Sequence, residues 1–224
     1  MIEIIGMTVE DAKTIEVCGG DRIELVSALT EGGLTPSYGL MESVMKNVDI
    51  PVNVMIRPHA NGFVYSEEDL KIMKRDIQVA KSLGANGIVL GILDENNNID
   101  EKHLIELLNE CDGLDVTFHK AIEETNIHES MKILNRYKRI TNVLTAGGKK
   151  SISENIYDIK KLISNSKNIK VILGGGLNFD NIREISESTK ATDFHFGTAI
   201  RVDNSPFKSI DEEKLKKLVS LLKA

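Results

Sequence analysis

Short apolar runs recur along the chain, and each is followed by a segment with the periodicity of an amphipathic helix. The runs lie at residues 2–5, 22–26, 52–57, 87–90, 115–119, 142–145, 170–173 and 193–197. Strands that alternate with helices form parallel βαβ units, and eight units can close into a barrel without free sheet edges. The pattern therefore predicts an α/β fold, a (β/α)8 TIM barrel.

The alternation runs through the whole chain without a linker, so we expect one compact domain over residues 1–224. The longest polar stretch is the loop at residues 94–100. A TIM barrel typically needs about 250 residues, which predicts short loops here. An open doubly wound sheet is the alternative, but it would want a glycine-rich turn after the first strand, where only Gly6 stands.

Hydroxyl side chains mark several expected helix starts. Thr8 with Asp11 and Ser66 with Asp69 are spaced like capping boxes. The pair at residues 35–36, Thr-Pro, places a hydroxyl at a predicted N-cap and proline at the first helical position.

Polar residues stand at strand positions that alternation turns toward the barrel axis. Glu24, Arg57, His119 and His195 all have this parity. Barrel enzymes place their sites at the C-terminal strand ends, and burying charge without purpose is costly. These four are therefore the candidate catalytic residues. Lys120 follows the fifth strand, but its parity points it away from the axis and disfavours a Schiff-base role.

Structural interpretations of the same residues stay open. Glu24 and Arg57 lie on neighbouring strands and could form an ion pair inside the barrel. Glu3 and Arg22 lie lower, where they fit such a pair or a polar plug. His195 is mid-strand between bulky neighbours, so a buried core histidine is an equal alternative.

Glycine-rich turns follow the last three strands. Barrels often bind phosphate with the loops after strands seven and eight, because glycine lets backbone N–H groups approach an anion. The alternative is that the glycines only form tight turns. The candidate anion-binding residues are Gly147, Gly148, Gly174, Gly175, Gly176, Gly197 and Thr198.

Composition narrows the class of partner. The net charge is −6, tryptophan is absent and aromatics are 4%, all of which argue against a nucleic-acid partner. Cys18 and Cys111 belong to no Cys/His cluster, so the metal ligands stay unknown. The chain lacks a basic leader and a long apolar run, which predicts a cytoplasmic protein without a membrane partner.

Eight stretches stand in the order of a known family's motifs and span most of the chain. They are residues 21–25 (DRIEL), 32–37 (GGLTPS), 56–58 (IRP), 63–66 (FVYS), 73 with 76–77, 87–93 (GIVLGIL), 117–119 (TFH) and 144–147 (LTAG). With these motifs the chain resembles the CutC family, named for copper homeostasis. The resemblance implies a TIM barrel, a cytoplasmic location, a homodimer and a role in copper homeostasis or copper binding. The chain departs from the family pattern at Val26, often cysteine, at His59 and Lys120, commonly arginine, and at Ala146.

Two functions follow as alternatives. Copper as cofactor or partner rests on the family name alone, because copper(I) prefers sulfur and copper(II) imidazole, and Arg57 would repel a cation. The other is an enzyme or binding protein for a small anionic metabolite, phosphorylated or carboxylated, at the barrel mouth. In that case Glu24 or His119 would be the general acid or base, and Arg57 would hold the anion. The sequence names neither a substrate nor a reaction.

Overall fold

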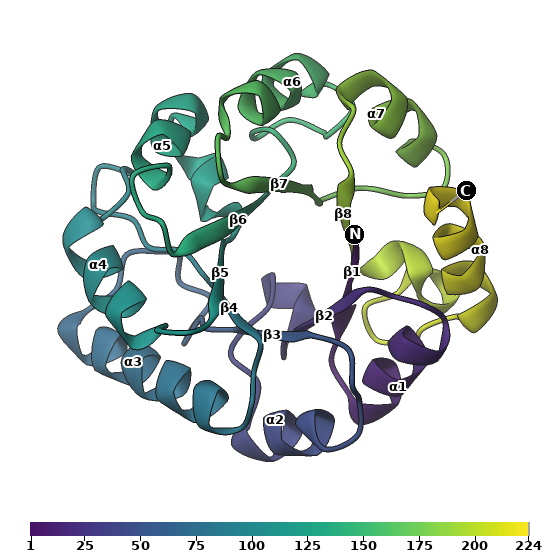
Figure 1. The fold of residues 1–224 in the computed structure, drawn as a ribbon, viewed down its shortest axis with the longest axis horizontal. Helices are drawn as coiled ribbons and strands as arrows, with labels where there is room; N and C mark the ends of the chain where they lie inside the picture. Colours follow the sequence, from purple (N-terminus) through teal and green to yellow (C-terminus); the bar gives the residue numbers. More distant parts are fainter. Residues whose placement is uncertain (224) are drawn as a thin grey trace.

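The computed structural model describes residues 1–223 and shows eight parallel strands closed into a barrel in sequence order (Figure 1). The strands are β1 (Ile2–Gly6), β2 (Arg22–Leu25), β3 (Val52–Met55), β4 (Gly87–Leu90), β5 (Asp115–Phe118), β6 (Ile140–Thr145), β7 (Lys170–Leu173) and β8 (Asp193–Phe196). The TIM barrel predicted from the alternation of strands and helices is confirmed.

Eight α-helices form a ring around the barrel (Figure 1). They are α1 (Val9–Val17), α2 (Tyr38–Met45), α3 (Glu67–Ser82), α4 (Glu101–Glu110), α5 (Ile127–Leu134), α6 (Ile156–Asn165), α7 (Ile182–Thr189) and α8 (Glu212–Lys223). Four short 3-10 helices follow strands of the barrel. They are η1 (Leu29–Glu31) after β2, η2 (Lys120–Glu124) after β5, and η3 (Thr198–Ile200) and η4 (Val202–Asn204) after β8. Within residues 1–223, none of the helices has both the length and the apolar character that a membrane crossing requires.

The main hydrophobic core lies between the barrel and the helices. Outward strand residues such as Ile23 and Phe196 are buried there against apolar helix faces. A separate small apolar cluster contains Ile5, Val26 and Met55, one strand position out of phase with the main core. Alternation therefore leaves the intervening polar side chains of β2 and β8 on the axis, as the sequence predicts.

Two of the three expected helix starts are confirmed. Thr8 caps α1 by accepting from the N–H of Asp11, and Ser66 forms a full capping box with Asp69 at α3. Helix α2, however, is capped by Ser37, and residue 35 lies outside it. The Oγ1 of Thr35 instead accepts a hydrogen bond from the backbone N–H of Arg57 at 2.9 Å. The expected cap at Thr35 is wrong because a second hydroxyl, two residues on, takes that role.

Both cysteines lie at the opposite end of the barrel from the C-terminal strand ends. Cys18 ends α1 and Cys111 ends α4, and the crossover helices run back toward the N-terminal ends of the strands. Both thiols are free and buried, and burial raises the pKa of Cys111 to about 12. Both cysteines therefore stand apart from the barrel mouth.

Candidate functional site

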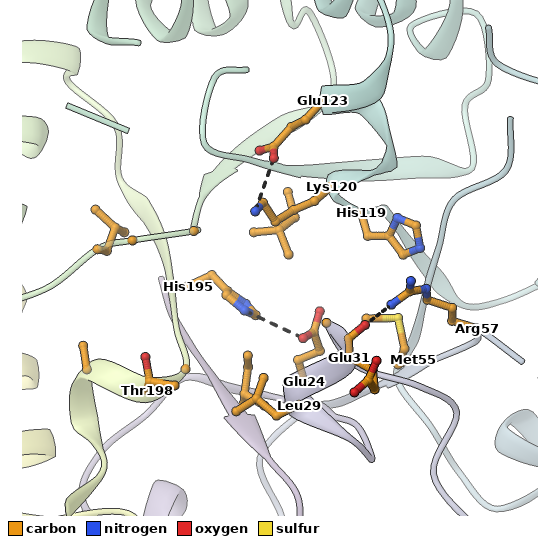
Figure 2. Close-up of a pocket in the computed structure, with 18 of the residues that line it drawn as sticks. Glu24, Leu29, Glu31, Met55, Arg57, His119, Lys120, Glu123, His195 and Thr198 are labelled. Carbon is orange, nitrogen blue, oxygen red and sulfur yellow. Dashed lines mark hydrogen bonds and ion pairs between the residues drawn. The ribbon is translucent and has the colours of Figure 1, made fainter. Parts of the chain in front are cut away.

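A cavity of about 590 Å³ opens among the C-terminal ends of the strands (Figure 2). It brings together the four candidate catalytic residues, Glu24, Arg57, His119 and His195. They come from β2, β8 and the segments that directly follow β3 and β5, so they surround the mouth from different sides.

A buried chain of polar groups crosses the inner end of this cavity. The Nδ1 atom of His195 lies 2.8 Å from Oε1 of Glu3, and its Nε2 atom lies 3.7 Å from Oε2 of Glu24. Arg22 donates from Nε to the other oxygen of Glu3 at 2.6 Å. The register explains the contacts, because Glu3 pairs with Arg22 across β1–β2 and with His195 across β1–β8. Of the two interpretations of Glu3 and Arg22, an ion pair or a polar plug, the structure shows the ion pair.

Burial and charge set the proton affinities of this chain. Burial raises the pKa of Glu24 to about 7, and the negative charge of Glu3 adds to the effect. Burial alone would lower the pKa of His195, but the two carboxylates outweigh it and raise the pKa. Burial likewise opposes ionisation of Glu3, yet the bonds from His195 and Arg22 hold its pKa below the usual value. Near neutral pH, Glu24 and His195 therefore compete for a proton.

Arg57 is buried, and its positive charge meets no carboxylate in residues 1–223. Its Nη1 atom donates to the backbone oxygens of Glu31 at 2.6 Å and Gly33 at 3.2 Å, which anchors η1 to the site. Its guanidinium carbon lies 5.0 Å from the centre of the Phe63 ring, and its Nε atom is buried without a partner in the described chain. The Glu24–Arg57 ion pair considered as an alternative is not formed; Glu24 lies against His195 instead.

His119 is held as a neutral imidazole. Its Nδ1 atom accepts from the N–H of Ala121 at 3.1 Å, so the neutral ring carries its proton on Nε2. Burial and the nearby charge of Arg57 lower its pKa to about 3. Its Nε2 atom is buried and bonds to no described group. This histidine therefore suits a hydrogen-bond donor better than a base that titrates near neutral pH.

Lys120 lines the cavity, which corrects the expectation that it points away from the axis (Figure 2). Its Nζ atom lies 3.2 Å from Oε2 of Glu123, and a side chain at Gly175 would collide with it. Strand β5 ends at Phe118 and η2 begins at Lys120, so strand alternation no longer sets the direction of this side chain. Glu123 also lines the cavity and is not among the predicted site residues; its i,i+3 spacing from Lys120 is the signal in the sequence that points to it.

The turns after β7 and β8 contribute four of the seven candidate anion-binding residues to the cavity wall: Gly175, Gly176, Gly197 and Thr198. Gly175 and Gly176 have φ values of +90° and +97°, which explains why glycine stands there. Their backbone N–H groups donate no hydrogen bond within the described residues. The turn after β7 can therefore offer donors to a bound anion.

The other three glycines do not line the cavity formed by residues 1–223: Gly147, Gly148 and Gly174. The turn after β6 is closed by Asn155, whose Nδ2 atom donates to the backbone oxygens of Ala146 and Gly148. A side chain at Gly147 would meet Asn155, and one at Gly174 would meet His195. At Gly147 and Gly174 the structure shows a packing reason for glycine.

Comparison with known proteins gives one consistent result. The model of the CutC family matches residues 1–200. A human protein named copper homeostasis protein cutC homolog is 41% identical over 198 residues, which cover 87% of this chain and 72% of the human protein. A CutC family protein of Vibrio campbellii is 40% identical over 182 residues, covering 79% of this chain and 73% of that protein.

Solved structures agree with the fold. A Streptococcus agalactiae structure described as copper homeostasis protein CutC superposes with a TM-score of 0.83 at 33% identity, covering 89% of this chain and 99% of that one. A phosphoribosyl anthranilate isomerase of Thermotoga maritima reaches a TM-score of 0.68 at 17% identity, with 99% and 98% covered. The second likeness concerns the barrel fold alone.

Proposed function

The chain belongs to the CutC family, and we propose that it binds a small anionic organic molecule in the cavity at the C-terminal strand ends. Membership of the family agrees with the barrel fold, but it identifies no ligand for this cavity. The chemistry of the cavity wall supports a phosphorylated or carboxylated metabolite.

The buried charge of Arg57 carries the proposal. Three arginines of the described chain are buried, and two of them, Arg22 and Arg201, meet the carboxylates of Glu3 and Asp11. Arg57 bonds to backbone oxygens and lies over an aromatic ring, and no carboxylate of the described residues pairs with it. A buried charge without a counterion is costly, and guanidinium groups match carboxylate and phosphate oxygens. A ligand anion would supply the missing charge.

Other groups on the wall support an anion with a polar organic part. Lys120 adds an ammonium group that also pairs with Glu123, and the Gly175–Gly176 turn adds backbone donors. His119 offers a neutral donor to a ligand oxygen. Glu24 lies across the cavity from Lys120 and His119, and it is the candidate acid or base (Figure 2).

The test is a thermal-shift screen of phosphorylated and carboxylated metabolites, followed by calorimetry and by mass spectrometry for turnover. We expect anions to raise the melting temperature of the wild type, and Arg57→Ala to abolish the effect. Arg57→Lys, which keeps the charge, should bind more weakly but measurably. Arg183→Ala, at an exposed site on α7, is the matched control. Equal anion binding by Arg57→Ala, or no binding by any anion in the wild type, would contradict the proposal.

Copper handling is the alternative that the relatives' names suggest. Copper(I) prefers sulfur ligands, but Met55 is the one sulfur residue on the cavity wall within residues 1–223, and both cysteines lie at the other end of the barrel. The described residues hold one cluster of three potential metal ligands, Glu3, Glu24 and His195. It offers copper(II) a single imidazole, and the guanidinium of Arg22 already occupies Glu3.

These donors do not fit a copper site. Calorimetry with copper(I) and copper(II) on protein without tags should show only weak, non-stoichiometric uptake. Tight stoichiometric binding that His195→Asn abolishes would establish copper handling in place of our proposal.

A cytoplasmic location and a homodimer are proposed from the family resemblance. The two free, buried cysteines are consistent with a reducing compartment. Exposed apolar side chains beside the groove between α2 and α3, Tyr38 and Ile72, support a protein partner on that face. Light scattering on the purified chain tests the dimer, and Ile72→Glu should favour the monomer.

A further inference from the structure

We propose that this cavity removes and returns a proton next to the carbonyl group of a small anionic carbonyl compound, with Glu24 as the base. His195 shares that proton, and Glu3 is a positioning residue that acts through His195. The inference rests on the proposed anion binding and adds a substrate class and a reaction to it.

The position of Glu24 carries the assignment of the base. Its side chain is 2% exposed, its Oε1 atom has no hydrogen-bond partner in the described chain, and its carboxylate points into the cavity (Figure 2). A buried carboxylate oxygen without a partner costs free energy unless a bound molecule supplies one. This oxygen is therefore the group poised to take a proton from a ligand.

The chain behind Glu24 explains how the proton is kept. Arg22 holds Glu3, and Glu3 lies 2.8 Å from Nδ1 of His195, so Nε2 of the ring faces Glu24 at 3.7 Å. A carboxylate on one ring nitrogen fixes the orientation of the imidazole and strengthens its hold on a proton. With a proton on His195, two carboxylates face two cations and the cluster is electrically balanced. A proton thus completes this cluster, whereas a divalent metal ion would leave it with excess positive charge.

His119, across the cavity from Glu24, and Arg57, just after the neighbouring strand β3, are groups that stabilise an oxyanion. The neutral ring of His119 has its proton on Nε2, which bonds to no described group, and the charge of Arg57 lies beside it. A neutral donor and a fixed positive charge stabilise the negative charge that develops on an enolate oxygen. A carboxylate or phosphate on the same molecule would be attracted by Lys120 and Arg57.

The step balances without a further reactant. The C–H bond next to the carbonyl breaks, and its electron pair forms a C=C bond while the carbonyl electrons move onto oxygen. Glu24 takes the proton, His195 shares it, and the return of the proton to the same carbon regenerates the carbonyl compound. Where that carbon carries a hydroxyl group, the hydroxyl proton moves to the former carbonyl oxygen and the held proton goes to the former carbonyl carbon, which gives the isomeric carbonyl compound.

The experiment follows deuterium uptake from D2O by proton NMR, with dihydroxyacetone phosphate and pyruvate as probes and the full-length protein treated with EDTA. We expect the wild type to exchange the C–H protons of at least one probe well above the buffer rate. Glu24→Gln, nearly isosteric, should lose about 100-fold or more of that rate. His195→Asn should also slow the exchange, and Arg183→Ala should leave it unchanged. Near-UV circular dichroism confirms that each variant is folded.

Glu3 needs a readout that a purely structural residue would not move. The charged groups that face His195 are Glu3 on β1 and Arg22 and Glu24 on β2; Lys120 and Arg57 lie across the cavity. Glu3→Gln removes a negative charge from His195, so the pH midpoint of the exchange rate should move to lower pH. Glu3→Asp, which restores the charge, should move it back.

The outcomes separate the two proposals. Calorimetric binding of a probe that depends on Arg57, without exchange above buffer, would overturn this inference and leave anion binding standing. Failure of both probes and of every other anion to bind would overturn the proposed function, and the inference with it. Exchange that persists in Glu24→Gln, or that needs added Zn²⁺ or Cu²⁺, would overturn the assignment of Glu24 as the base.

Discussion

Replacing Glu24 by glutamine should remove the contribution of this carboxyl group to the dependence of folding stability on pH. The folded protein holds the proton of Glu24 with a pKa of about 7, against 4.5 for an ordinary glutamate, because the carboxyl is buried. Between these two values the folded state binds more protons than the unfolded state. Stability from this group is therefore full below pH 4.5 and is lost as the pH rises through 7.

The size of the effect follows from the two pKa values. Each tenfold difference in proton affinity is worth about 1.4 kcal/mol, so ionising Glu24 in the folded state costs about 3 kcal/mol. Glutamine has nearly the same shape and never ionises. The difference between the free energy of unfolding of Glu24→Gln and that of the wild type should therefore increase by about 3 kcal/mol in favour of the variant as the pH rises from about 4 to about 8.

Urea unfolding at a series of pH values, with EDTA present, measures this difference. Glu95→Gln removes a carboxylate from an exposed loop and is the control; its curve should stay parallel to the wild type. In a protein that also carries His195→Gln, the pH-dependent difference in unfolding free energy caused by Glu24→Gln should be larger. The reason is that the imidazolium of His195 lowers the pKa of Glu24, which burial raises. A gap that is constant across the pH range would refute the reasoning, since it would mean that the fold fully compensates the buried charge.

Three further perturbations have directions set by the structure. His119→Asn should lose less stability in acid than the wild type. Burial lowers the pKa of His119 to about 3, so the stability that its neutral ring contributes is lost as the pH falls from 6.5 through that value. Urea unfolding at about pH 4 and about pH 7 measures the difference. Gly91→Ala should destabilise by about 1–3 kcal/mol, since the new methyl group would collide with the ring of His119, and the melting temperature reports it; an unchanged value would mean that the ring can move. Arg201→Ala should cost about 3–5 kcal/mol, because it strips the buried carboxylate of Asp11 of a partner 2.8 Å away, whereas the exposed Arg183→Ala should cost almost nothing.

The barrel was predictable because two simple periodicities repeat eight times. The same alternation correctly turned Glu24, Arg57 and His119 to one cavity. It failed for Lys120, where the strand had already ended and a 3-10 helix sets the direction of the side chain. Parity alone also could not reveal that His195 contacts Glu3, since that contact depends on the register across the β1–β8 seam. Periodicity thus predicts faces, whereas register and local turns decide contacts.

The seam between the first and last strands has a consequence for biosynthesis. Glu3 and His195 are 192 positions apart in the chain, yet they share one hydrogen bond. A ribosome must deliver nearly the whole protein before the imidazole exists to meet its carboxylate. Until then Glu3 has only Arg22 as a partner, and the unclosed sheet exposes both of its edges. The proton-holding chain therefore forms only with barrel closure, so a prematurely terminated product would lack the reactive centre altogether.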